Sequence, residues 1–97
     1  GRGSHNHKFH KIKEIISFYP HLQYVLLGDD SQRDPYIYEE ICKIFPKNIK
    51  AIYIRQTSKS KSKVLKILQN IESLGVSVCY FKFSNEAIAH SKEIGII

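Results

Sequence analysis

The sequence has no apolar run that approaches the roughly 20 residues a membrane-spanning helix needs, and it shows no secretory signal. Its two cysteines, Cys42 and Cys79, are far apart, and each lies in an apolar stretch. We therefore expect buried, reduced thiols rather than a disulfide. Such thiols are typical of a cytoplasmic protein, with peripheral attachment to a membrane as an alternative.

Several signatures of known chemistry are also missing. There is no glycine-rich phosphate-binding loop, no nucleophile elbow and no cysteine–histidine dyad. The five histidines show no paired metal-binding spacing with a third ligand; they are His5, His7, His10, His21 and His90. The common nucleotide-binding loops, hydrolase motifs and zinc sites are therefore not indicated.

The composition favours a folded domain with an anionic partner. The 97 residues are 42% hydrophobic, enough for a packed core, and they carry a formal net charge of +6. This charge suits nucleic acid, a phosphate ester or an anionic membrane without choosing among them. Residues 1–5 resemble an expression-tag remnant, which leaves 6–97 as one small domain or part of one.

Four amphipathic segments alternate with three apolar runs. Helical spacing predicts helices over 7–19, 34–45, 64–74 and 84–93, with the second opened by Asp34 as N-cap, the third closed by Gly75 and the fourth capped by Ser84. Strands are expected over 23–27, 49–54 and 76–81, the first buried on both faces because it is continuously apolar. The inward face of the third helix is expected to include Leu65 and Leu74, and that of the second Ile44.

The resulting order, αβαβαβα, predicts an α/β domain of three-layer, Rossmann-like type with three parallel strands. A three-stranded sheet is narrow, and its edges are exposed unless something covers them. A missing N-terminal portion would explain such a sheet.

Ligands of open parallel sheets bind beyond the carboxyl ends of the strands. There the first predicted strand is followed by three carboxylates within six residues, Asp29, Asp30 and Asp34. They repel one another and favour a counter-ion, and Mg²⁺ takes oxygen ligands and often only one or two protein carboxylates. The alternative is that the segment is an ordinary turn with Asp34 as helix cap and no metal.

Basic residues supply the complementary half of a phosphate site. Lys8 lies near the start of the first helix and Arg55 follows the second strand, so both are candidate phosphate ligands, with a solvated helix-end charge as the alternative for Lys8. Lys59 and Lys61 lie in the loop over 56–62, and Lys63 follows it directly. These lysines suggest a contact with anionic lipid or nucleic acid, or simply a soluble flexible loop.

These residues together resemble the catalytic domain of the actin-patch-associated phosphatidate phosphatases and their uncharacterised bacterial relatives. The resemblance extends from about His7 to the C-terminus. It rests on His7-Lys8-Phe9, Tyr19-Pro20, Val25-Leu26-Leu27-Gly28-Asp29-Asp30-Ser31-Gln32-Arg33-Asp34-Pro35, Ile37-Tyr38, Phe45-Pro46, Ala51-Ile52-Tyr53-Ile54-Arg55, Ala87-Ile88-Ala89-His90 and Gly95-Ile96-Ile97.

The resemblance implies a haloacid-dehalogenase-like, Mg²⁺-dependent phosphatase that acts on a phosphomonoester such as phosphatidate. In that superfamily one aspartate attacks phosphorus, a second acts as acid and base, and Mg²⁺ bridges. Asp29 and Asp34 match the family's strand-end metal motif, and Lys8 matches the lysine that holds the phosphoryl group. These three would therefore be the catalytic residues, with Asp29 and Asp34 as metal ligands and Lys8 and Arg55 as phosphate ligands.

The chain departs from the family in two respects. The nucleophile motif, Asp-x-Asp-x-Thr, is absent, because Asp30 is adjacent to Asp29 rather than two residues on, and the Ser/Thr phosphate-binding strand end that normally precedes the lysine is missing too. We therefore expect the C-terminal half of a phosphatase domain, inactive alone, whose N-terminal half is a missing partner, and only weak Mg²⁺ binding. The alternative is a non-catalytic basic α/β module that binds phosphate ligands, an anionic membrane or, less favoured, nucleic acid.

Overall fold

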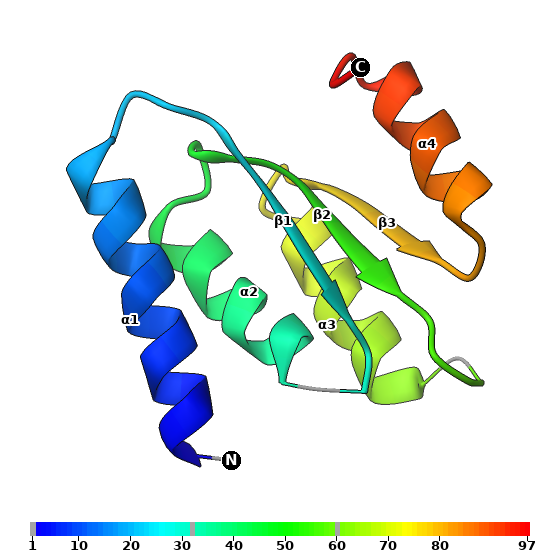
Figure 1. Cartoon of the computed structure of the whole chain (residues 1–97), viewed down its shortest axis with the longest axis horizontal. Helices are drawn as coiled ribbons and strands as arrows, with labels where there is room; N and C mark the ends of the chain where they lie inside the picture. Colours follow the sequence, from blue (N-terminus) through cyan, green and yellow to red (C-terminus); the bar gives the residue numbers. More distant parts are fainter. Residues whose placement is uncertain (1, 32, 60) are drawn as a thin grey trace.

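The computed structural model describes residues 2–31, 33–59 and 61–97. In these residues helices and strands alternate along the whole chain (Figure 1). They are α1 (Arg2–Phe18), β1 (Tyr24–Asp29), α2 (Asp34–Ile44), β2 (Ile49–Arg55), α3 (Ser62–Glu72), β3 (Ser77–Phe81) and α4 (Ser84–Glu93). The predicted order αβαβαβα is confirmed.

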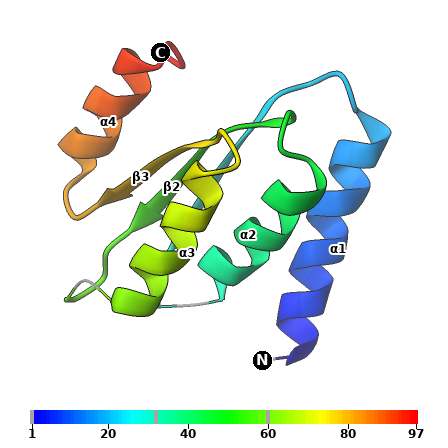
Figure 2. The same ribbon diagram turned by 180° about the vertical axis from the view of Figure 1, so that it is seen from behind.

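The strands form one parallel sheet in the order β1-β2-β3. Helices α1, α2 and α3 lie on one face of this sheet, as the views from the front and from behind show (Figures 1 and 2). Helix α4 packs against β3 on the opposite face, where the His90 ring contacts the Tyr53 ring of β2. The architecture is therefore the predicted three-layer, Rossmann-like α/β arrangement.

The hydrophobic core lies between the sheet and the first three helices. Alternate residues of β2 point into it, and the helices contribute one apolar stripe each. Its fully buried members include Ile16, Ile37, Ile41, Cys42, Ile52, Ile54 and Ile71. Cys42 and Cys79 are free thiols, as expected, and burial raises the pKa of Cys42 to about 12. Cys79, however, is only partly buried, because it shares with Tyr53 the face of the sheet that α4 covers in part.

The prediction that the first strand is buried on both faces is wrong. Leu27 is 68% exposed and Val25 37% exposed, whereas their neighbours Tyr24 and Leu26 pack against the core. The reason is that α4 packs beside β3 and leaves the β1 side of its face open. Helix spacing alone also overestimated burial at Ile44, Leu65 and Leu74, which are exposed at helix ends or flanks.

Helix ends differ from the predictions in a consistent way. Asp34 and Ser84 are the first helical residues rather than the N-caps, which are Arg33 and Phe83. Gly75, predicted to close the third helix, has φ +90° two residues after the Ser73 C-cap, a conformation that favours glycine. Helix α1 begins at Arg2, five residues before the predicted start and within the segment interpreted as a tag remnant; Gly1 lies outside the described residues.

Candidate functional site at the carboxyl edge of the sheet

The predicted site residues gather at the carboxyl ends of the strands. The last residues of β1, β2 and β3 are in register, with Asp29 beside Arg55 and Arg55 beside Phe81. Because each helix runs antiparallel to the strands, the N-terminal ends of the helices lie at the same edge (Figure 1). Asp34, at the start of α2, is thereby brought to the end of β1. Lys8 was predicted near the start of the first helix but is the seventh residue of α1, because that helix begins at Arg2; its side chain reaches this edge through Asp34.

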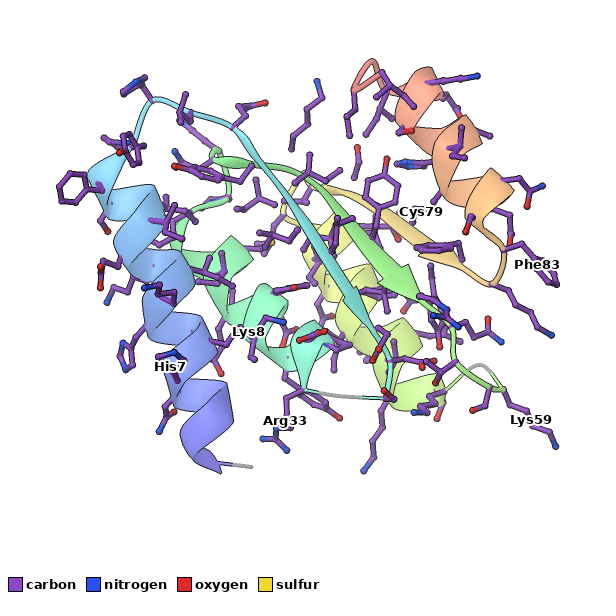
Figure 3. The ribbon with its side chains drawn as sticks, viewed as in Figure 1. His7, Lys8, Arg33, Lys59, Cys79 and Phe83 are labelled. Atoms are coloured by element: carbon purple, nitrogen blue, oxygen red, sulfur yellow. The ribbon has the colours of Figure 1, made fainter. Side chains whose placement is uncertain are left out.

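Lys8 and Asp34 form the central contact of this edge. The Lys8 Nζ atom donates a hydrogen bond of 2.6 Å to Asp34 Oδ1, and Figure 3 shows Lys8 between α1 and the beginning of α2. Burial acts to lower the pKa of Lys8, but the hydrogen bond from its ammonium to Asp34 and that carboxylate's negative charge outweigh it, so the pKa lies above its ordinary value. The ammonium therefore stays charged at neutral pH.

The second oxygen of Asp34 connects this pair to β1. Asp34 Oδ2 accepts a hydrogen bond of 3.2 Å from the backbone N–H of Asp29. The approach is close because residue 28 is glycine: a Cβ atom there would lie 2.5 Å from Asp34 Oδ2. The Gly28-Asp29 dipeptide thus lets a helix-start carboxylate reach the strand end, and both Asp34 oxygens are engaged.

The Asp29 side chain extends to the other face of the sheet. Side chains alternate along a strand, so Asp29 and Leu27 share the face that carries α4. Asp29 Oδ1 accepts hydrogen bonds from the Ser31 backbone N–H, at 2.9 Å, and from its hydroxyl, at 2.8 Å. Within the described residues Asp29 Oδ2 has no hydrogen-bond partner, which leaves an oxygen for a ligand.

Arg55 lies beside Asp29 but outside the Lys8–Asp34 contact. As register partners in adjacent parallel strands, Asp29 and Arg55 point to the same face. Arg55 is exposed, and in the described part of the chain its guanidinium has no hydrogen bond or ion pair. The edge thus presents one cation on each side of Asp29, Lys8 toward the helices and Arg55 toward α4.

Asp30 has a role that the sequence pattern did not reveal. Its side chain is completely buried and accepts hydrogen bonds from the Thr57 N–H, at 3.0 Å, the Thr57 hydroxyl and the Tyr80 hydroxyl. Lys61 donates to the Asp30 backbone oxygen at 2.7 Å. Burial acts to raise the pKa of Asp30, but these hydrogen bonds and the Lys61 charge lower it below its ordinary value.

The Asp30 network joins the ends of all three strands. It links the turn after β1 to the loop after β2 and to Tyr80 of β3, directly beneath the edge. The only signal in the sequence was the adjacent pair Asp29-Asp30, since successive residues point to opposite sides. One carboxylate of the pair is therefore structural, and the other is available.

The oxygen donors at this edge are of a kind that suits Mg²⁺. Asp29 offers one unpaired carboxylate oxygen, and Mg²⁺ is commonly held by one or two carboxylates, with water and phosphate completing the shell. No group of three or more histidine, cysteine or acidic side chains with metal-binding geometry occurs in the described residues. Asp29 thus offers one oxygen ligand of the kind that a hard cation takes.

The three lysines in and after the loop that follows β2 differ in their contacts. All three lysines are exposed, but Lys61 is held by its bonds to Asp30, whereas Lys59 and Lys63 form no ion pair within the described residues. Gln32 of the acidic turn and Ser60 of this loop lie outside the described residues. In the described ranges, no helix is both long and apolar enough to cross a membrane.

This geometry defines the class of protein: an α/β domain whose parallel sheet has a polar, charged carboxyl edge. A family model described as phosphatidate phosphatase APP1, catalytic domain, matches residues 1–56. The chain therefore belongs to that family, as its resemblance predicted. Comparison with curated proteins and with solved structures gave no match. The matched range contains Lys8, Asp29, Asp34 and Arg55, whereas the resemblance of the tail over 87–97 stays a prediction.

Proposed function

We propose that the chain is the C-terminal half of a Mg²⁺-dependent, haloacid-dehalogenase-like phosphatase domain that hydrolyses a phosphomonoester lipid of the phosphatidate type. The observation that carries this proposal is the continuous contact from Lys8 through Asp34 to the backbone of Asp29, at the edge where an open α/β sheet binds its ligand. The family described for residues 1–56 supplies the substrate class.

In this proposal each residue has one task. Lys8 binds a phosphoryl oxygen and stabilises the negative charge that develops there, and Asp34 holds the Lys8 ammonium in place. Arg55 contacts the phosphate from the opposite side of Asp29. Lys8, Asp34 and Arg55 all lie in helices or strands, which position side chains more rigidly than loops would.

Asp29 is proposed to hold Mg²⁺ through its unpaired oxygen, and Asp34 stays a predicted second ligand. When bound, the metal would neutralise phosphate charge and act as a Lewis acid. Asp34 is already engaged by Lys8 and by the Asp29 N–H, so metal binding through its side chain requires one of these bonds to open.

The aspartate that attacks phosphorus is proposed to come from a second polypeptide segment that packs beside β1. Within the described residues β1 pairs with β2 alone, and Leu27 and Val25 of β1 are exposed on the face of the sheet that carries α4. These side chains line an apolar groove of about 290 Å³ together with Phe81 and Ile88. A complementary half domain would cover this apolar surface. The free thiols support a cytoplasmic location.

Phosphate release from phosphatidate tests the proposal. The chain alone should be inactive, and activity should appear when it is expressed together with the segment that its gene encodes upstream of Lys8. Lys8→Gln should then lower kcat by at least about 100-fold. Lys47→Gln, on the opposite edge, is the matched control and should be silent. If the upstream segment contains no Asp-x-Asp-x-Thr motif, the phosphatase assignment fails, and a non-catalytic phosphate-binding module takes its place.

Metal binding is tested separately by titrating the chain with Mg²⁺ and following Asp29 and Asp34 by NMR. Because only half of the site is present, we expect a Kd in the millimolar range or weaker, roughly 4 kcal/mol of binding free energy at most. Asp29→Asn should remove the shifts. Submicromolar binding, or shifts elsewhere in the chain, would mean that the metal site has been misplaced.

A further inference from the structure

The carboxyl edge carries more positive charge than the proposed phosphate site uses. Seven basic side chains surround four carboxylates there: Lys8, Arg33, Arg55, Lys59, Lys61, Lys63 and Lys82 against Asp29, Asp30, Asp34 and Glu86. Lys8 and Lys61 are paired with Asp34 and Asp30. The remaining basic side chains face solvent at the rim, so the edge as a whole is positive.

Three of these lysines have no assigned task. Lys59 lies in the loop after β2, Lys63 is the second residue of α3, and Lys82 follows β3 directly. All three are exposed, and among the described residues none forms an ion pair with a carboxylate. The segments that carry Lys59 and Lys82 leave the sheet side by side, because the Gln56 N–H donates a 2.7 Å hydrogen bond to the Phe81 carbonyl at the ends of β2 and β3.

An apolar side chain lies beside one of these lysines. Phe83 is 62% exposed in the turn between β3 and α4, and the Lys82 ammonium lies 5.8 Å from its ring centroid. The backbone of this turn is fixed, because the N–H groups of Lys82 and Phe83 both donate to Glu86 Oε1, at 3.0 and 2.8 Å. Figure 3 shows Phe83 and Lys59 projecting outward from the molecule.

An exposed aromatic ring beside unpaired lysines matches the interface of an anionic bilayer. At such an interface lysines lie near the lipid phosphate groups, and each positive charge adds roughly 1 kcal/mol of binding free energy, or about fivefold in affinity. An aromatic ring enters the headgroup layer. A nucleic-acid contact would use the same lysines. The bilayer is favoured because the rim borders a site proposed to take a lipid phosphate.

We propose that Lys59, Lys63, Lys82 and Phe83 form a membrane-docking rim that places the carboxyl edge of the sheet against an anionic bilayer. The inference rests on the proposed function for its orientation, since docking through the rim turns Lys8, Asp29 and Arg55 toward the lipid headgroups. The docking itself needs neither Mg²⁺ nor hydrolysis.

Sedimentation with vesicles of phosphatidylcholine and phosphatidylserine, free of phosphatidate, tests the electrostatic part. The triple variant Lys59→Gln, Lys63→Gln, Lys82→Gln should bind roughly 100-fold more weakly than the unaltered chain. The control is the triple variant Lys43→Gln, Lys47→Gln, Lys92→Gln, which removes the same charge from the opposite edge. Its affinity for the vesicles should stay within about threefold of that of the unaltered chain. Equal losses in both variants would mean that net charge, not the rim, attracts the membrane.

The ring is tested by fluorescence, because the chain contains no tryptophan. Phe83→Trp should show a blue-shifted emission when anionic vesicles are added, and about 0.5 M salt should reverse it. Phe18→Trp places the reporter at the far end of α1, where Phe18 is 75% exposed, and its emission should not shift. A shift at residue 18 but not at residue 83 would overturn the proposed orientation.

The outcomes separate this inference from the phosphatase assignment. Vesicle binding by the rim with no phosphatase activity in the completed domain would remove only the assignment. Activity on a short-chain, soluble phosphatidate without vesicle binding would remove only the rim. Binding to an RNA oligonucleotide that depends on the same lysines, with no vesicle binding at low salt, would overturn the inference in favour of nucleic acid.

Discussion

At the scale of single residues, Asp30 is the carboxylate on which the carboxyl edge depends. Its side chain is inaccessible to solvent and receives hydrogen bonds from Thr57 and Tyr80. Asp30→Asn leaves some of these donors without an acceptor. We expect it to lower the free energy of unfolding by about 2–3 kcal/mol in urea titrations. Asp29→Asn is the control and should change it by less than about 1 kcal/mol, since within the described residues that side chain accepts hydrogen bonds from Ser31 alone.

The lowered pKa of Asp30 also predicts how stability depends on pH. Its ordinary pKa is 3.8, and the folded-state pKa lies below that value. The contribution of its ionised form is therefore fully present above pH 3.8 and is lost as the pH falls through the folded pKa. Acid titration followed by circular dichroism should show a steeper loss of stability for the unaltered chain than for Asp30→Asn. Parallel curves would show that Asp30 does not drive the acid transition.

Gly28 allows the contact between α2 and β1 at the same edge. In Gly28→Ala the new methyl carbon would lie 2.5 Å from Asp34 Oδ2 and 2.8 Å from its Cβ and Cγ atoms, so Asp34 must move. We expect a loss of about 1–3 kcal/mol of unfolding free energy and weakening of the Lys8–Asp34 bond. NMR chemical shifts of the Lys8 ammonium check this directly. Unchanged shifts would contradict the role given to the glycine.

At the scale of elements, α4 is the least firmly attached helix. None of its residues is buried, and its main polar tie is the 2.7 Å contact between the Tyr53 hydroxyl and His90 Nδ1. Tyr53→Phe removes that contact, worth about 1 kcal/mol. Amide hydrogen exchange within α4 should become roughly fivefold faster, because local opening becomes easier, while exchange in α2 and α3 should not change.

Tyr24→Phe is the matched control for this element. It removes a hydroxyl that donates to the Tyr19 carbonyl at 2.9 Å, near the end of α1 and far from α4. Exchange in α4 should stay as in the unaltered chain. If both variants accelerate α4 equally, the helix is coupled to the whole fold rather than held by its contact with Tyr53.

At the scale of the whole molecule, the two faces of the sheet differ in how completely the helices cover them. Leu27→Ser, on the open face, should change the stability of the isolated chain by less than about 0.5 kcal/mol, whereas Ile52→Ala, on the core face, should lower it by about 2–5 kcal/mol. In the completed catalytic domain, Leu27→Ser should become destabilising, because the complementary segment that we propose would bury that position. Urea titrations of both forms measure this difference.

The order of elements and the fold class were predictable because they depend on local periodicity. Apolar spacing, the prolines and Gly75 mark where helices and strands begin and end, and alternation requires parallel crossovers. The helix caps were less predictable: Asp34 and Ser84 have the right chemistry for an N-cap, but each lies one position inside its helix. The engagement of Asp34 with Lys8 and Asp29 explains why its side chain does not cap.

The sequence by itself determined the chemistry available at the edge: acidic residues after the first strand, Arg55 after the second and Lys8 near the start of the first helix. Only the tertiary structure decided which of these groups are free. Asp29 and Asp30 are adjacent and chemically identical, yet one reaches solvent and the other is enclosed by Thr57 and Tyr80. That distinction depends on contacts between segments distant along the chain, and such contacts leave no periodic trace in the sequence.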